Sequence, residues 1–173
     1  MDFLIDLLQI TIPSLLVFLT AWLILRNLLK NDQDKRRQEL ILQNSRTITP
    51  IRLQAYERIV LFLERISFES LLVRTNNSGM NVAQLHSALL NSIRSEFEHN
   101  LSQQIYMTQQ AWEIVKNARS STIKLINTEF EKMKEDASGL EYSRKLLERV
   151  MQLEKEPTRT AIEFIKAELQ KII

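Results

Sequence analysis

The residue pair best suited to metal chemistry in this 173-residue chain is Glu96 and His99, spaced as E-x-x-H. On a helix, this spacing places a carboxylate and an imidazole on one face, as in di-iron bundles, which use two such motifs and further inward-facing glutamates. The chain has one such motif and two histidines. His99 also lies near a predicted helix end, where a protonated imidazole interacts favourably with the helix dipole. We therefore predict no metal site and no cofactor.

Residues for covalent catalysis are equally sparse. The sequence contains no cysteine, and no G-x-S-x-G or S-x-x-K element in a setting that fits a hydrolase. Its two glycines, Gly79 and Gly139, stand alone, so no glycine-rich loop can enclose a phosphate. His86 lies between two apolar stripes, which is typical of a residue at the edge of a core. We therefore predict no catalytic residues.

The element that positions the rest of the chain is an uncharged, mostly apolar run over residues 7–25. About 19 residues at 1.5 Å each span roughly 28 Å, close to the ~30 Å hydrocarbon core of a bilayer. A helix satisfies its own backbone hydrogen bonds in lipid, so the run predicts a transmembrane helix. A cleaved signal peptide fits less well, because residues 1–6 are acidic and the apolar run is too long. A buried helix of a soluble core is the other alternative.

The charges on either side of this run predict its orientation. Asp2 and Asp6 precede it, whereas Arg26, Lys30 and the cluster Lys35, Arg36, Arg37 follow it. Positive residues stay on the cytoplasmic side, so we expect a single-pass protein with residues 1–6 outside and the C-terminal domain in the cytoplasm. The three-residue basic cluster is expected to contact anionic lipid. Charges of both signs alternate over the rest of the chain, which argues against nucleic acid as a partner.

One face of the predicted membrane helix is partly polar. At 100° per residue, about a quarter of its circumference holds Asp6, Gln9, Pro13, Leu16 and Thr20. Polar side chains gathered on one face favour contact with another membrane helix, from another integral membrane protein or from a second copy of this chain. The alternative is that each of these residues is tolerated individually.

The remaining sequence predicts an all-α protein. Residues 26–49 are rich in helix formers and are expected to form a juxtamembrane stalk or linker, which can continue the membrane helix and is broken at residues 45–49. Residues 50–173 predict a cytoplasmic antiparallel bundle of about five helices with short loops. Helices are expected to start at Thr49-Pro50, Ser67, Asn81, Thr108, Leu140 and Pro157, with Ser138-Gly139 ending the helix that Thr108 begins.

The segment from residue 100 to residue 112 interrupts two predicted helices and is the best candidate surface for a partner. Its conformation over residues 101–107 is ambiguous. It contains residue types that are enriched at interfaces, namely Gln103, Gln104, Tyr106, Met107 and Trp112. The alternative is ordinary loop packing, with Trp112 in the core.

Two stretches, RLQAYERIVLFLERI over residues 52–66 and EFEHNLSQQIY over residues 96–106, carry a resemblance when taken with the N-terminal run. Together they resemble a family of small membrane-anchored, all-helical proteins of unknown function from Bacteroidota. The resemblance covers most of the chain. It implies the same architecture in a bacterial inner membrane, and it supplies neither an activity nor functional residues.

Two functions from different classes follow. The first is a non-catalytic membrane-anchored adaptor or accessory subunit of an inner-membrane protein assembly. The alternative is a small-molecule-binding sensor or enzyme with a cavity in the helical bundle. A polar-lined pocket that contains His86, His99 or Glu96 would favour the alternative, whereas a dry, packed core would argue against it.

Overall fold

The structure, a computed structural model, describes the backbone of residues 2–172. Side chains are described for residues 15–26, 35–36, 39, 42–43 and 46–171. The chain divides into two compact units, Met1–Ile48 and Thr49–Ile173.

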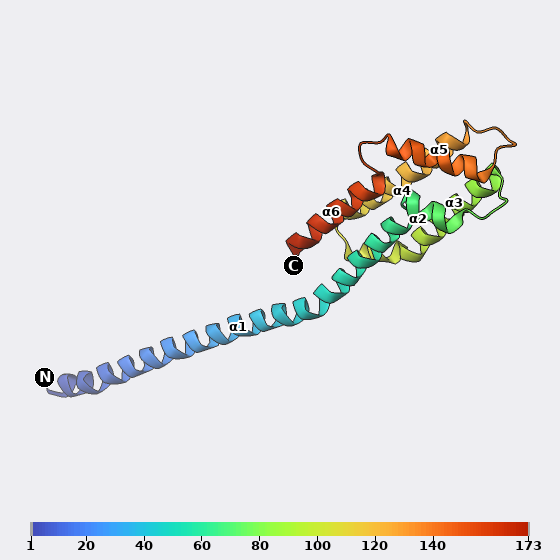
Figure 1. Cartoon of the computed structure of the whole chain (residues 1–173). Coiled ribbons are helices and arrows are strands. Elements are labelled where there is room, and N and C mark those ends of the chain that lie inside the picture. Colours follow the sequence, from blue (N-terminus) through green and yellow to red (C-terminus); the bar gives the residue numbers. More distant parts are fainter. Residues whose placement is uncertain (1, 173) are drawn as a thin grey trace. The chain divides into compact units, whose positions relative to one another are not determined.

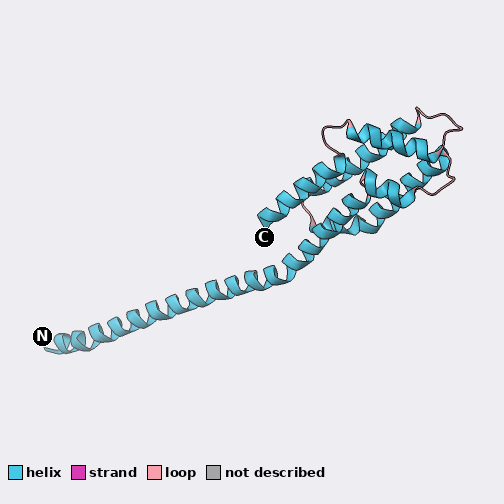
Figure 2. Ribbon diagram, viewed as in Figure 1, coloured by secondary structure: helices cyan, strands magenta, loops and turns pink. Residues whose placement is uncertain are grey.

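Over the described backbone the chain is helical and contains no strand, which confirms the predicted all-α fold (Figure 2). The α-helices are labelled in Figure 1, and the helices have these bounds: α1 Asp2–Arg65, α2 Phe68–Thr75, α3 Val82–Asn100, the 3₁₀ helix η1 Leu101–Tyr106, α4 Gln109–Phe130, α5 Gly139–Met151 and α6 Pro157–Ile172. The ambiguous segment at residues 101–107 is thus mostly a 3₁₀ helix.

The predicted membrane span receives no support from the structure. Among the residues that the structure describes, no helix offers a stretch that is both long and apolar enough to cross a bilayer. Residues 7–14 of the predicted span lie outside the described side chains, and so do Asp6, Gln9 and Pro13 of its predicted contact face.

The predicted break at residues 45–49 is wrong, because α1 continues through this segment and through Pro50. Thr49 is therefore inside a helix and does not cap one. Proline removes the hydrogen bond that its own N–H would have made to the carbonyl of Arg46, and its ring crowds that carbonyl. The turns that follow Pro50 are held by the core of the second unit, so one lost hydrogen bond does not end the helix.

The core of the second unit, residues 49–173, is a helical bundle, as predicted. Helix α4 packs against α6 and α3, and α3 packs against α2 and α5. The last turns of α1 supply Tyr56, Ile59, Phe62 and Leu63, and Ile66 follows directly after the helix. All five are fully buried, whereas Ile51 and Leu53 are exposed. The other helices complete the core with apolar residues that include Leu71, Leu85, Leu89, Ile93, Val115, Ile126, Leu146 and Ile165.

Two predicted helix starts are confirmed by their hydrogen bonds. The Asn81 side chain accepts from the backbone N–H of Gln84 at 2.8 Å, and the Gln84 side chain accepts from the N–H of Asn81 at 3.0 Å. This reciprocal capping box begins α3. The Thr108 hydroxyl likewise accepts from the N–H of Ala111 at 3.1 Å and begins α4.

The end of α4 differs from the prediction. The helix ends at Phe130, and the turns that follow lead to Ser138, whose hydroxyl caps α5 by accepting from the N–H of Glu141 at 3.1 Å. Gly139 is the first residue of α5 and does not end a helix. Its N–H donates to the carbonyl of Met80 at 2.8 Å, and a Cβ on it would lie 2.9 Å from that same oxygen. Close packing therefore explains this glycine.

Candidate functional site

The first candidate site is a segment of α1 in the first unit, residues 15–25, where every large apolar side chain is exposed. The exposed fraction runs from 45% at Leu23 to 72% at Phe18. Because these residues are nearly consecutive, their side chains surround the helix on all sides. The Trp22 ring lies beneath the guanidinium of Arg26, 5.3 Å from centroid to Cζ. The segment therefore presents a continuous apolar surface around the helix.

Some of the residues predicted to contact partners or lipid are described in this unit. Leu16 and Thr20, from the predicted contact face, are both exposed, and the Thr20 hydroxyl donates to the carbonyl of Val17 at 2.9 Å. Lys35 and Arg36 are exposed, whereas the side chain of Arg37 lies outside the described residues. Their predicted contacts with a second helix and with anionic lipid stay predictions.

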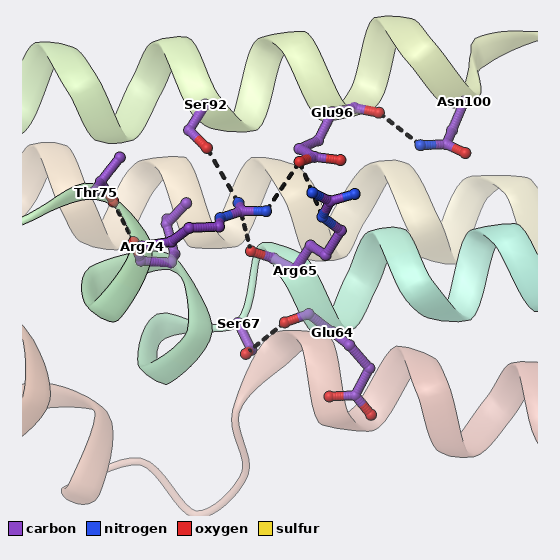
Figure 3. Close-up of polar contacts among 9 residues, drawn as sticks. Glu64, Arg65, Ser67, Arg74, Thr75, Ser92, Glu96 and Asn100 are labelled. Atoms are coloured by element: carbon purple, nitrogen blue, oxygen red, sulfur yellow. Dashed lines mark hydrogen bonds and ion pairs between the residues drawn. The ribbon is translucent and has the colours of Figure 1, made fainter.

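The second candidate site is an ionic cluster in the second unit, formed by Arg65, Arg74, Ser92 and Glu96 and here called the Glu96 cluster (Figure 3). One carboxylate oxygen of Glu96 accepts from Arg65 Nε at 3.1 Å and from Arg74 Nη1 at 3.0 Å. Arg74 also donates to the Ser92 hydroxyl and to the carbonyl of Arg65, both at 3.2 Å. These contacts join the end of α1 to α2 and α3.

Next to this cluster lies a groove of about 190 Å³ between α1 and α3, here called the Glu96 groove. Helix α1 lines it with Arg58, Leu61, Phe62 and Arg65, and α3 lines it with Glu96, His99 and Asn100. The two residues of the E-x-x-H pair therefore share one groove, as their spacing predicts. The side chain of Glu96 is 17% exposed and its carboxylate is bonded to two guanidinium groups, whereas His99 is exposed.

His86 lies apart from the residues that line this groove. Its Nε2 atom is 2.9 Å from the side-chain oxygen of Asn127, and its ring stacks on Phe130 with a centroid distance of 3.9 Å. The side chain is half-buried, as expected for a residue at the edge of a core. Its position gives it a packing role between α3 and α4.

The predicted partner surface is divided by the structure. Gln103 and Trp112 are buried, and the Trp112 ring stacks on Phe97 with a centroid distance of 5.6 Å. Gln104 and Tyr106 are exposed, and Met107 is half-buried. Gln103 and Trp112 are therefore too buried to contact a partner directly. A partner surface in this segment would consist of the exposed residues of η1.

A further polar cluster, which the sequence did not indicate, ties three helices together. Thr108, the cap of α4, donates its hydroxyl to the carboxylate of Glu168 on α6 at 2.9 Å, and Tyr56 on α1 donates to the same carboxylate. Burial raises the pKa of the Tyr56 phenol, and the bond to Glu168 raises it further. Local spacing predicts the Thr108 cap but cannot identify a partner 60 residues away.

Comparison with known proteins identifies a family and nothing closer. No curated protein and no solved structure matches the chain. A family model described as a family of unknown function (DUF7935) matches residues 2–172. Because this match covers nearly the whole sequence, the chain belongs to that family of unknown function.

Proposed function

We propose that this protein is a non-catalytic membrane-anchored adaptor or accessory subunit of an inner-membrane protein assembly. The observation that carries the proposal is the exposure of the apolar side chains from Leu15 to Leu25 on all sides of α1. Burying a large apolar side chain is worth roughly 1.5–3 kcal/mol, so leaving this whole segment in water would forgo more than about 10 kcal/mol. Soluble monomers rarely expose a continuous apolar surface of this kind.

Lipid is the environment that this segment fits best. Its backbone groups are satisfied within the helix, and its side chains carry no charge between Leu7 and Leu25. The basic residues Lys35 and Arg36 follow the segment, and Asp2 and Asp6 precede it, which supports an N-terminus outside and a C-terminal domain in the cytoplasm. We extend this setting, a bacterial inner membrane, to the family as a whole.

An adaptor also needs a surface for its partner, and η1 is our choice. Ile105 is 72% exposed and Leu101 is 42% exposed, and both lie in the short helix between α3 and α4 beside Tyr106. Arg52 Nε donates to the carbonyl of Tyr106 at 3.3 Å and fixes the end of η1 against α1. Exposed apolar and aromatic side chains on a held segment suit contact with another protein.

The test compares the natural chain with Leu19→Arg, which places a charge within the apolar segment, and with the control Leu42→Arg, which places it outside. A cation at the centre of a membrane helix costs about 2.5–3.5 kcal/mol on insertion scales. We expect the natural chain and the control to stay in carbonate-washed membranes, whereas Leu19→Arg is partly lost from them. Mild-detergent purification of the natural chain should recover a second protein in stoichiometric amount.

Two results would contradict the proposal. Recovery of the natural chain in the aqueous fraction, or equal retention of both variants in the membranes, would contradict the proposed membrane anchor. Purification of the chain from membranes as a monomer without a partner would agree with the anchor and contradict the adaptor function.

A further inference from the structure

The Glu96 groove has an excess of positive charge that its own contacts do not consume. Arg65 and Arg74 both bond to one oxygen of Glu96, and Arg58 lies on the same face of α1 as Arg65, seven residues earlier. Glu96 is the single carboxylate among the groove's lining residues. Two guanidinium groups among the lining residues, those of Arg58 and Arg65, beside this one carboxylate leave a formal charge of +1, and Arg74 bonds to the same carboxylate from outside the lining.

The positions of these groups suit an oxyanion. Arg58 and Arg65 are separated by about 10 Å along the axis of α1, at 1.5 Å per residue. His99 lines the groove from α3, so cationic or N–H donors approach from two helices. Guanidinium groups bind phosphate and carboxylate oxygens through paired, charge-assisted hydrogen bonds. A phosphate monoester presents three terminal oxygens, one more than a carboxylate, and so can accept hydrogen bonds from Arg58 and Arg65 together.

The floor and wall of the groove add an apolar component. Phe62 is 1% exposed and lies beneath the groove, and Leu61, on its edge, is 54% exposed. The volume of about 190 Å³ is smaller than that of sites for drug-sized ligands, roughly 300–1,000 Å³. The groove therefore has room for a phosphate group and a short organic substituent.

We propose that the Glu96 groove binds the phosphate monoester group of a small phosphorylated compound, with Arg58 and Arg65 holding the phosphate and Leu61 contacting its substituent. Glu96 is the positioning residue, because its carboxylate holds the side chain of Arg65 at the edge of the groove. This proposal goes beyond the adaptor function and does not depend on the membrane anchor.

The experiment is a calorimetric titration of the full chain, in neutral detergent at low ionic strength, with phenyl phosphate and separately with inorganic phosphate. Both probes should bind, phenyl phosphate more tightly. Arg58→Gln should weaken the binding of both probes by at least about tenfold, because it removes a charged hydrogen-bond donor. The matched control, Arg144→Gln on α5, makes the same charge change at another exposed arginine and should leave affinity within about twofold.

Leu61→Ala tests the apolar contact separately from the phosphate contacts, since it should weaken the binding of phenyl phosphate and leave the affinity for inorganic phosphate unchanged. Micelles doped with phosphatidic acid form a second arm: Arg58-dependent competition there would identify a lipid headgroup as the source of the phosphate. Absence of binding at millimolar probe concentrations, or an equal loss of affinity in Arg58→Gln and Arg144→Gln, would overturn the proposal. Equal effects of Leu61→Ala on both probes would overturn the apolar contact.

Discussion

Tyr142 is the residue whose ionisation should be visible in the stability of the second unit. Its side chain is fully buried, and its hydroxyl donates to the carbonyl of Ile126 at 2.6 Å. Burial raises the pKa of this phenol above its ordinary value of 10, and the nearby carboxylate of Glu129 raises it further. The pKa of Tyr56 is raised in the same direction.

A raised phenol pKa means that the native state keeps a proton that the unfolded chain loses above about pH 10. The stabilisation is therefore complete below pH 10 and is lost as pH rises from there towards the native pKa. Each such tyrosine contributes a slope of up to about 1.4 kcal/mol per pH unit. We expect the free energy of unfolding, measured with urea, to fall steeply between about pH 10 and about pH 11.5.

Tyr142→Phe isolates this residue from the lysines that titrate in the same range. At pH 8 the variant should be less stable by about 1 kcal/mol, because the carbonyl of Ile126 loses its hydrogen bond. Above pH 10 the difference should shrink, since the variant has one fewer buried phenol. Tyr106→Phe, at an exposed position, should keep the slope of the natural chain. An unchanged slope in Tyr142→Phe would contradict the assignment.

Residue-level prediction from sequence succeeded where spacing alone decides and failed where the partner is distant. The E-x-x-H spacing places Glu96 and His99 in one groove, but it does not indicate that Arg65 and Arg74 bind the carboxylate. Both arginines come from other helices, so only the tertiary fold reveals them. Trp112 is buried with its ring on Phe97, which matches the alternative of core packing, and this contact too is visible only in the tertiary fold.

At the scale of the element, Gly139 offers a direct test of why α5 begins where it does. Gly139→Ala would place a Cβ 2.9 Å from the carbonyl oxygen of Met80, which also accepts the N–H of residue 139. Because a backbone atom cannot move aside cheaply, we expect a loss of about 1–3 kcal/mol in urea unfolding.

The control for this variant is the next residue, Leu140→Ala. Leu140 is 72% exposed, so its truncation should change the free energy of unfolding by less than about 0.5 kcal/mol. If Gly139→Ala were neutral, or raised stability through its better helix propensity, the close contact with Met80 would not be what selects glycine here.

Helix starts were easier to predict than helix ends in this chain. The Asn81 and Thr108 caps each involve residues three positions apart, so the sequence contains all the information. The role of Gly139 depends on Met80, which belongs to another segment. The continuity of α1 through Pro50 depends on the core that anchors the following turns, and local propensity does not report that support.

At the scale of the whole molecule, the core residues found among the described side chains all lie in one unit. Its buried residues run from Tyr56 to Ile165, all within Thr49–Ile173. We therefore expect the burial of these side chains not to require residues 1–48. A fragment of residues 49–173 should fold by itself.

The new N-terminus of that fragment explains why the cut at residue 48 should be tolerated. In the full chain, Thr49 and Pro50 lie inside α1, where proline costs a hydrogen bond. In the fragment they become the first residues of the helix, where threonine can cap and proline is favoured. The capping interaction that the full chain does not use becomes available when the preceding turns are removed.

We expect the fragment to unfold cooperatively, with a Tm within about 5 °C of the same transition in the full chain, because about 1 kcal/mol shifts the Tm of a domain this size by a few degrees. The measurement is thermal unfolding by circular dichroism, with near-ultraviolet signals from Trp112 reporting the core. A fragment that begins at residue 43 serves as the control for the cut. A broad transition and strong binding of a hydrophobic dye in the shorter fragment alone would show that residues 43–48 hold the last turns of α1 in place. The same behaviour in both fragments would show that the core needs the first unit.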